Sequence, residues 1–311
     1  MLAKDIKGLI QSKYAEAREN KALFFNDGDT STKCNSENGM MYWIRFVPTL
    51  LTKPEKGDTP ANSDPLGKHE PELLVLQDMD VVEREYKLVL NKFPIMPNHS
   101  LLITNAYKHQ NDMLIPSDLS KCYALLQQVD TATERHFIIF NCGPESGSSQ
   151  NHKHLQLLQF LDGFVPFQDR LCNDIEPFLP SMKLPPLQDK FVSFAHFVVP
   201  LPELPTEEYL MTCYISLFEH ILAFVKDNNE KNEPPVSYNF ILTKEWMCLV
   251  PRSSIRAQTL PVGFNSIGYL GLVIIKEEDT LLKVKENPDI IDTLLLECGF
   301  PNAMKLKHQT F

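Results

Sequence analysis

Apolar residues recur at intervals of three and four in several stretches of the chain, and this spacing predicts helices. The predicted helices lie near residues 2–14, at 117–134 with Ser117 as N-cap, at 206–227 with Thr206 as N-cap, and at 287–299 with Asn287 as cap and Pro288 as first helical residue. The last three of these helices begin with a residue type that can cap a helix, and the final one also has a proline suited to its first turn.

Short apolar runs, each broken by Pro, Asn or a polar cluster, predict strands between these helices. The strand-like runs cover residues 40–51, 71–80, 86–104, 136–141, 154–160, 190–199, 238–243 and 246–252. The intervening stretches 27–70 and 175–205 are rich in turn residues or proline and are expected to contain surface loops and crossing segments.

Strands grouped into sets with a helix between them indicate an α+β fold with a largely antiparallel sheet flanked by helices. We expect a single domain over residues 1–311, whose N-terminal half ends near residue 175 and whose C-terminal half, about 176–311, completes one shared site. Two unrelated domains divided at the proline-rich stretch remain an alternative.

The composition of the chain is that of a soluble globular protein. The chain has 311 residues, of which 43% are hydrophobic and 23% charged, values that are ordinary for a soluble protein. No apolar run is long enough to predict a membrane span, and charges interrupt the N-terminus where a signal peptide would be apolar. The net charge of -10 argues against a nucleic-acid binder.

The seven cysteines are scattered, odd in number and never form a C-x-x-C pair. This usage favours reduced thiols and hence a cytoplasmic protein, with the nucleus as a second location, and argues against a structural zinc site.

Candidate chemistry is concentrated in one stretch, "SGSSQNHKHLQLLQF", residues 146–160. Side chains alternate on a strand, so His152, His154 and Gln156 are expected on one face, and Leu155 and Leu157 on the other, in the core. The glycine and serine residues ahead of them let backbone N–H groups and short hydroxyls approach an anion closely. An imidazole nucleophile beside such a loop suits covalent transfer at phosphorus.

Two simpler explanations remain open for the histidine pair. H-x-H at strand spacing can bind a metal ion, although a third His, Cys or carboxylate would be needed and Gln156 is a poor substitute. The two histidines could also be surface residues without a function, but the adjacent Gly-Ser loop and Gln156 in the same register argue against this explanation.

The segment from Asn141 through "GSSQNHKHLQ" resembles the active-site signature of the histidine-triad superfamily, in its H-x-H-x-Q branch of nucleotidyltransferases and phosphorylases. Together with "NKFPIMPNHSLLIT", "SYNFILTKEWMCLVPRS" and "GFNSIGYLGLVIIK", it is similar over nearly the whole chain to the fungal diadenosine tetraphosphate (Ap4A) phosphorylases. The related galactose-1-phosphate uridylyltransferases have H-P-H, whereas Lys153 separates the histidines here. The resemblance implies an enlarged version of the histidine-triad fold.

The resemblance also implies a reaction. His154 would attack the α-phosphorus of Ap4A and form an adenylyl-histidine, releasing ATP, and inorganic phosphate would then take the adenylyl group to give ADP. Gln156 would hold a phosphoryl oxygen, and His152 would position the loop and its neighbour. The reaction would be reversible, and adenosine 5′-phosphosulfate could serve as a second donor, the sulfate adenylyltransferase (ADP) activity.

By the same resemblance, the residues expected to contact nucleotide or phosphate are Lys53, Asn91, Lys92, Asn141, Gly147, Ser148, Ser149, Gln150, Gln156, Asn265, Gly271 and Lys276. Gly268 and Gly271 could equally be packing glycines, and His196 and Arg252 could be structural. No protein metal ligands are expected, so a divalent cation, Mg²⁺ or Mn²⁺, would arrive with the nucleotide.

The implied partners are dinucleoside polyphosphates, ATP, ADP, AMP and inorganic phosphate, without nucleic acid or membrane, and the chain is expected to be a monomer. A hydrolase that uses water as the acceptor is the alternative function, and a non-enzymatic nucleotide-binding or metal-binding module is a third.

Overall fold

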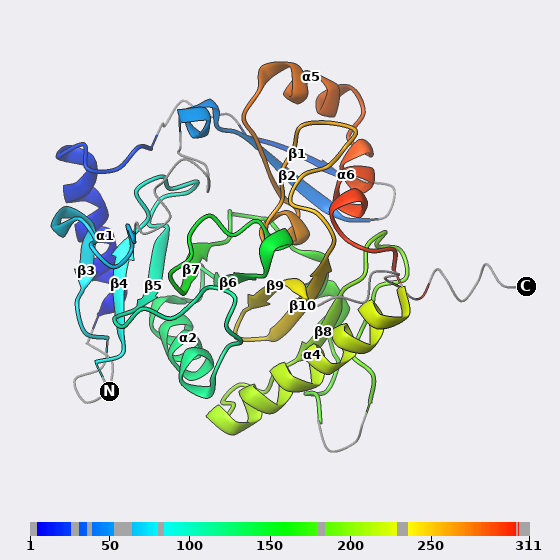
Figure 1. The fold of residues 1–311 in the computed structure, drawn as a ribbon, viewed down its shortest axis with the longest axis horizontal. Coiled ribbons are helices and arrows are strands. Elements are labelled where there is room, and N and C mark those ends of the chain that lie inside the picture. The colour runs from blue at the N-terminus through cyan, green and yellow to red at the C-terminus, as the bar shows by residue number, and fades with distance from the viewer. Residues whose placement is uncertain are drawn as a thin grey trace, which may run out of the picture.

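A computed structural model of the chain describes residues 5–25, 31–35, 39–52, 64–79, 84–179, 184–228, 236–302 and 304 (Figure 1). Its helices are α1 (Ile6–Glu19), α2 (Pro116–Val129), α3 (Phe167–Cys172), α4 (Glu207–Asn228), α5 (Glu278–Glu286) and α6 (Ile290–Cys298). Its strands are β1 (Ser31–Asn35), β2 (Met41–Phe46), β3 (Leu74–Leu76), β4 (Tyr86–Leu90), β5 (Ser100–Thr104), β6 (His136–Cys142), β7 (His154–Gln159), β8 (Phe197–Pro200), β9 (Ser237–Leu242), β10 (Trp246–Arg252) and β11 (Leu272–Ile275).

Eight of these strands form one sheet in the order β3-β4-β5-β7-β6-β9-β10-β8, and every neighbouring pair is antiparallel. Strands from both sides of residue 175 pair directly, since β6 is bonded to β9. The second sheet has the order β1-β2-β11 and contains the parallel pair β2-β11. The predicted α+β class with a largely antiparallel sheet is confirmed.

The two faces of the large sheet are covered differently. On one face, α1, α2 and α4 pack against alternate residues of the strands, among them Leu88, Leu155, Phe240 and Leu249. On the other face, β2, β11 and α6 cover the strands nearer the C-terminal half, with Ile139, Ile241 and Val250 in that second core. Over β4, β5 and β7 this second face stays partly open, and the site described below lies there.

Several predicted boundaries were wrong. Helix α2 ends at Val129 instead of residue 134, and Ser117 is not its cap; the Asp118 carboxylate accepts the N–H of Ile115, the N-cap residue, at 2.9 Å. The last predicted helix begins at Ile290 rather than at Pro288, and α5 precedes it unpredicted. Thr206 does cap α4, because its Oγ1 accepts the N–H of Tyr209 at 3.1 Å.

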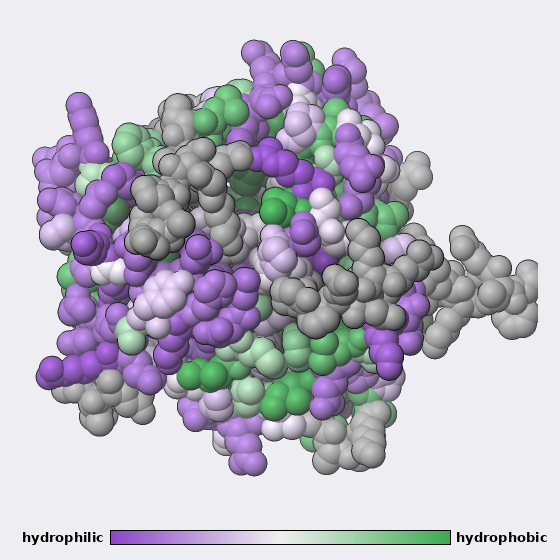
Figure 2. All heavy atoms as spheres, viewed as in Figure 1, coloured by the Kyte–Doolittle hydropathy of each residue, from purple (hydrophilic) through white to green (hydrophobic). Residues whose placement is uncertain are grey.

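Helix α4 is long and apolar enough, by length and composition alone, to cross a membrane. Six of its residues pack in the core against the sheet, which accounts for much of that composition: Leu210, Cys213, Tyr214, Leu217, Ile221 and Phe224. Its other side leaves Ile215 and Leu222 exposed, and Figure 2 shows apolar side chains gathered over this helix.

Six cysteines have described side chains, and all six are free thiols: Cys122, Cys142, Cys172, Cys213, Cys248 and Cys298. Burial raises the pKa of these thiols, to about 11 for Cys142, so they are protonated at neutral pH, and all but the partly exposed Cys172 are buried.

Candidate active site

A cleft of about 760 Å³ lies on the open face of the large sheet, between β4, β5, β6 and β7 on one side and β11 on the other. Its floor includes Leu101 of β5 and Ile139 of β6, while Leu272 and Ile274 of β11 form part of the facing wall. A cleft of this size with apolar walls and a few convergent polar groups is typical of a small-molecule site.

The H-x-H-x-Q motif enters this cleft through strand β7. His154 and Gln156 line the cleft, whereas Leu155 and Leu157 are buried on the opposite face, as the alternation of a strand requires. Lys153 also points to that opposite face and is 1% exposed. The expected placement of His154 and Gln156 on the same face is therefore what the structure shows.

The hydrogen bonding of His154 fixes its tautomer. Nδ1 lies 2.8 Å from the backbone oxygen of His152, and a carbonyl oxygen can only accept, so Nδ1 carries the proton. In the neutral ring the lone pair is then on Nε2. An imidazole held in this tautomer within a cleft is suited to attack as a nucleophile.

The loop ahead of the motif supplies small groups to the same cleft, which Gly147, Ser148, Ser149 and Gln150 all line. Gly147 has φ of 79°, and a side chain there would meet the backbone oxygen of Phe264 at 2.5 Å. Glycine is therefore required for the close approach of the loop to the segment around Asn265, which also lines the cleft.

Gln156 is oriented by a histidine that sequence reasoning missed. His99 is 3% exposed, lines the cleft, and its Nε2 lies 3.0 Å from Oε1 of Gln156. The amide oxygen thus faces His99, which places the two N–H donors of Gln156 on its other branch. The amide nitrogen of Asn91 lies 3.3 Å from Nε2 and 3.4 Å from Nδ1 of His99, and Oδ1 of Asn91 accepts the N–H of Phe93 at 3.0 Å.

The cleft carries a local surplus of positive charge in an acidic protein. Four basic residues line its described part, namely Lys68, Lys92, Arg256 and Lys276, against the two acidic residues Glu70 and Glu277. Lys92 forms an ion pair with Glu70 and lies over the ring of Phe24. Such a field suits an anionic ligand.

His69 is a further residue of this wall that the sequence did not suggest. Burial, assisted by the nearby charge of Lys87, lowers its pKa below the usual value for histidine. The neutral ring has a buried Nδ1 without a hydrogen-bond partner among the described residues. His69 therefore contributes a neutral polar group to the cleft rather than a charge.

His152, predicted to share the polar face, does not line the cleft. It is 2% exposed, with Nδ1 at 3.0 Å from the Asp64 carboxylate and Nε2 at 2.8 Å from the backbone oxygen of Thr104. Asp64 directly precedes Pro65, Leu66 and Lys68, which line the cleft. His152 thus connects the motif to that wall, and its expected role in positioning the loop and His154 stays a prediction.

Asn141 lies beneath the loop and outside the cleft lining. Its Oδ1 accepts from the side chain of Asn239 at 2.8 Å and from the hydroxyl and N–H of Ser266 at 2.7 and 3.0 Å. Arg252, 3% exposed, continues this network by donating to Asn239 and to the backbone oxygens of Ser146 and Phe264. Arg252 thus bonds the loop directly at Ser146, and Asn141 is linked to the loop through Asn239, which also donates to the backbone oxygen of Ser146.

Gly271 also lies outside the cleft lining and ends a short 3-10 turn with φ of 101°. A Cβ there would meet the backbone oxygen of Met41 at 2.3 Å, so its packing alone requires glycine. Lys53 falls outside the described residues. Lys276 lines the cleft, as expected for a contact residue, and Gly268, which was not predicted as a contact, lines it as well.

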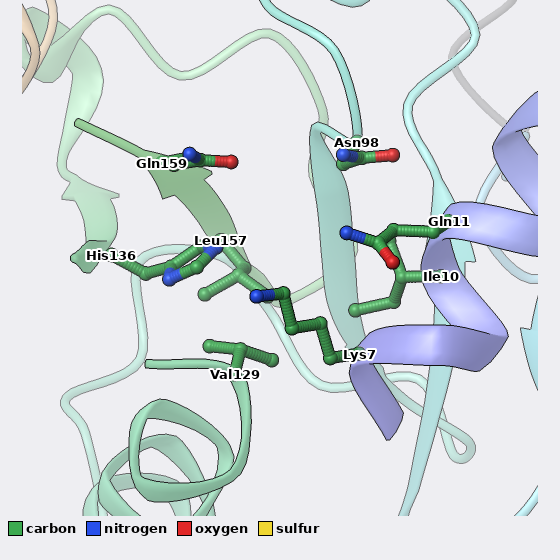
Figure 3. A pocket seen from close by; sticks show the side chains of 8 residues that line it. All are labelled: Lys7, Ile10, Gln11, Asn98, Val129, His136, Leu157 and Gln159. Atoms are coloured by element: carbon green, nitrogen blue, oxygen red, sulfur yellow. The ribbon is translucent and has the colours of Figure 1, made fainter. Parts of the chain in front are cut away.

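Within the described ranges, no group of three or more His, Cys, Asp or Glu side chains is placed to hold a metal ion. A second hollow, between Lys7, Gln11, Asn98 and His136, measures about 20 Å³ and could hold roughly one water molecule, so it is no rival to the cleft (Figure 3).

A histidine, an amide and a Gly-Ser loop around one cationic cleft are groups suited to transfer at a phosphoryl centre. Comparison with known proteins narrows this class. Residues 2–171 match the model for the Ap4A phosphorylase N-terminal domain, and residues 190–301 match the model for the ATP adenylyltransferase C-terminal domain. The chain belongs to the Ap4A phosphorylase family of nucleotidyltransferases, and the resemblance seen in the sequence is confirmed.

Individual relatives are similar over nearly their full length. "Protein APA1" of Saccharomyces cerevisiae is 48% identical, with 96% of this chain and 95% of the relative covered. Diadenosine 5′,5′′′-P1,P4-tetraphosphate phosphorylase 2 of the same yeast is 42% identical, with 97% of each covered. The crystal structure of yeast Ap4A phosphorylase Apa2 in complex with Ap4A matches with a TM-score of 0.87 at 40% identity, covering 97% of this chain and all of that one.

Proposed function

We propose that this protein cleaves Ap4A with inorganic phosphate to give ATP and ADP, through an adenylyl group carried on His154. The observation that carries the proposal is the position of His154, with Nδ1 donating to the backbone oxygen of His152 at 2.8 Å while the ring lines the cleft. The similarity to Apa2, whose structure was solved with Ap4A and with AMP, supports the substrate class.

The first half-reaction forms a P–N bond and breaks a P–O bond. His154 Nε2 attacks the α-phosphorus of Ap4A, and the bond from that phosphorus to the bridging oxygen breaks, so that ATP leaves. The second half-reaction reverses these roles, because a phosphate oxygen attacks the same phosphorus and Nε2 leaves with its electron pair. The product is ADP, and the imidazole returns to its starting tautomer.

The surrounding groups support each step. The Nδ1–H bond to a carbonyl stabilises the positive charge that the ring acquires when Nε2 is adenylylated. The N–H donors of Gln156 and the Gly147–Gln150 segment would bind phosphoryl oxygens as charge moves onto them. An amide at position 156 cannot exchange protons, and the resemblance to the phosphorylases associates this amide with phosphate rather than water as the acceptor.

Further parts of the proposal rest on the sequence resemblance. They are the reverse synthesis of Ap4A from ATP and ADP, the use of adenosine 5′-phosphosulfate as a second donor, a divalent cation that arrives with the nucleotide, and a monomeric protein in the cytosol or nucleus. The single large sheet built from both halves of the chain supports the monomer.

The test is the fate of the adenylyl group. Incubation with Ap4A radioactive at the α-phosphorus should label the wild-type protein with an acid-labile, base-stable group at His154. His154→Asn should abolish labelling and turnover and still bind nucleotide, since the cleft is otherwise intact. Turnover by His154→Asn near the wild-type rate would refute the covalent scheme.

The alternative acceptor is tested by products. A phosphorylase forms ADP only when phosphate is present, whereas a hydrolase releases AMP and ATP with or without phosphate.

A further inference from the structure

The hydrogen-bond ladder between β6 and β7 stops just before the proposed nucleophile. The two strands pair from His136↔Gln159 to Ile139↔Gln156. The same antiparallel register, continued by two residues on each strand, would pair Asn141 with His154. The described ladder contains no such pair, and the side chain of Gln110 lies between the two strands instead.

The side-chain amide of Gln110 makes the hydrogen bonds that a pairing of Asn141 with His154 would otherwise make. Its Oε1 accepts the backbone N–H of His154 at 2.8 Å, and its Nε2 donates to the backbone oxygens of Asn141 and His154 at 2.9 and 3.3 Å. In an antiparallel sheet both backbone groups of a residue point to the same neighbouring strand. Gln110 satisfies both groups of His154 as a paired residue would.

Backbone and side-chain hydrogen bonds on both sides hold Gln110 and its loop in place. Gln110 is 1% exposed, and its own N–H donates to the backbone oxygen of Asn151 at 2.7 Å. On the same loop, the backbone oxygen of Lys108 accepts the N–H of Lys153 at 2.8 Å. From the other strand, the N–H of Gly143 donates to Oδ1 of Asn111 at 3.1 Å. Shifting Gln110 would therefore break bonds to residues on each side of the catalytic loop.

We propose that Gln110 is a positioning residue for the transfer reaction: its amide spreads β6 and β7 apart and fixes the backbone of His154, and thereby the height and tilt of the imidazole in the cleft. The inference rests on the proposed role of His154. Displacing a nucleophile by about 1 Å can lower a rate on the order of 100-fold without a comparable loss of binding. Gln110 itself lies outside the cleft lining.

The experiment replaces the amide and keeps its volume. Gln110→Met should lower kcat for Ap4A phosphorolysis by about 10-fold to 100-fold with KM changed less than about threefold, because binding groups remain while the attack geometry is lost. Single-turnover labelling of the protein should slow by the same factor. Asn302→Leu is the matched control, since Asn302 is also fully buried and its amide donates to the backbone oxygens of Asp189 and Val192, and none of these residues lines the cleft. It should lower Tm and leave kcat within about twofold.

Wild-type kcat in folded Gln110→Met would overturn the inference, as would a rise in KM at unchanged kcat. If this variant does not fold, hydrogen exchange in the wild-type protein decides: the His154 amide must be protected, and exchange as fast as in an open loop contradicts the bond to Gln110. Labelling of the wild-type protein separates the two proposals, because its absence rejects the adenylyl-histidine and leaves the comparison of kcat values intact.

Discussion

At the scale of single residues, the contact between His99 and Gln156 predicts how the motif amide is held. His99→Ala removes the donor to Gln156 Oε1, so the amide can rotate and its N–H groups lose their fixed direction. We expect kcat/KM for Ap4A to fall about tenfold, which corresponds to one hydrogen bond of roughly 1.4 kcal/mol. Steady-state kinetics measure this.

His220→Ala is the control for that variant, because His220 lies on α4 and bonds to its own helix at the oxygen of Ser216. Its kcat/KM should stay within about twofold of the wild-type value. Equal losses in both variants would show that the effect of His99 is a general consequence of losing a histidine.

The residues around His154 and Gln156 show which parts of the site could be predicted from the sequence. His154 and Gln156 could be assigned to one face because Leu155 and Leu157 fix the other face in the core. His99 and Gln110 carry no such signal, since a single polar residue in a loop has no periodicity. Their roles depend on partners 57 and 44 positions away in the chain.

At the scale of elements, β7 is anchored to the start of α2 by a buried ion pair. Lys153 Nζ lies 2.6 Å from Oδ2 of Asp118, and both side chains are almost fully buried. Asp118 also accepts from Tyr86 at 2.7 Å, and Lys153 donates to the backbone oxygen of Met113 at 2.8 Å. The residue between the two motif histidines therefore connects the strand to a helix across the core.

This pair predicts a non-additive loss of stability. Lys153→Met leaves the Asp118 carboxylate buried without its counter-charge and should lower the free energy of unfolding by about 3–5 kcal/mol. Adding Asp118→Asn removes that charge, so the double variant should lose less than the sum of the two single variants. Urea denaturation of all four proteins measures the cycle, and strictly additive losses would contradict the coupling.

Elements were predictable where one face is apolar and the other polar. β6 and β9 are buried on both faces and still stood out as short apolar runs. Helix α5 was missed because only Thr280, Leu281 and Val284 of its nine residues are buried. The cap of α2 was misassigned since Ser117 and Asp118 are both good capping residues, and the bond of Asp118 to Lys153 could not be foreseen.

At the scale of the whole molecule, one continuous sheet places groups from both halves of the chain around the cleft. The N-terminal half contributes His99, His154 and Gln156, and the C-terminal half contributes Asn265 and Lys276. The histidine motif alone could not predict that both halves of the chain line the cleft. The facing wall belongs to a separate sheet, in which β2 and β11 pair across more than 200 residues. Any change that loosens this packing should affect binding and chemistry together.

The stability of this assembly should depend on pH through His196. The ring is fully buried, donates from Nδ1 to the backbone oxygen of Phe194 at 2.8 Å, and accepts at Nε2 from the N–H of Asp189 at 2.7 Å. Burial lowers its pKa to about 4, against a smaller opposing effect of the Phe194 bond and the Asp189 charge. A proton on Nε2 would break the bond from Asp189.

Between about pH 6.5 and pH 4 the unfolded chain binds a proton at position 196 and the folded protein does not. The neutral His196 therefore contributes its full share to the free energy of unfolding above pH 6.5. This free energy falls as the pH falls through the window, by about 2 kcal/mol between pH 7 and pH 5. His196→Gln can keep both hydrogen bonds but cannot titrate, so its unfolding free energy should fall about 2 kcal/mol less than that of the wild type over the same interval. Urea denaturation at pH 7 and pH 5 compares the two, and parallel losses would show that His196 is not the group responsible.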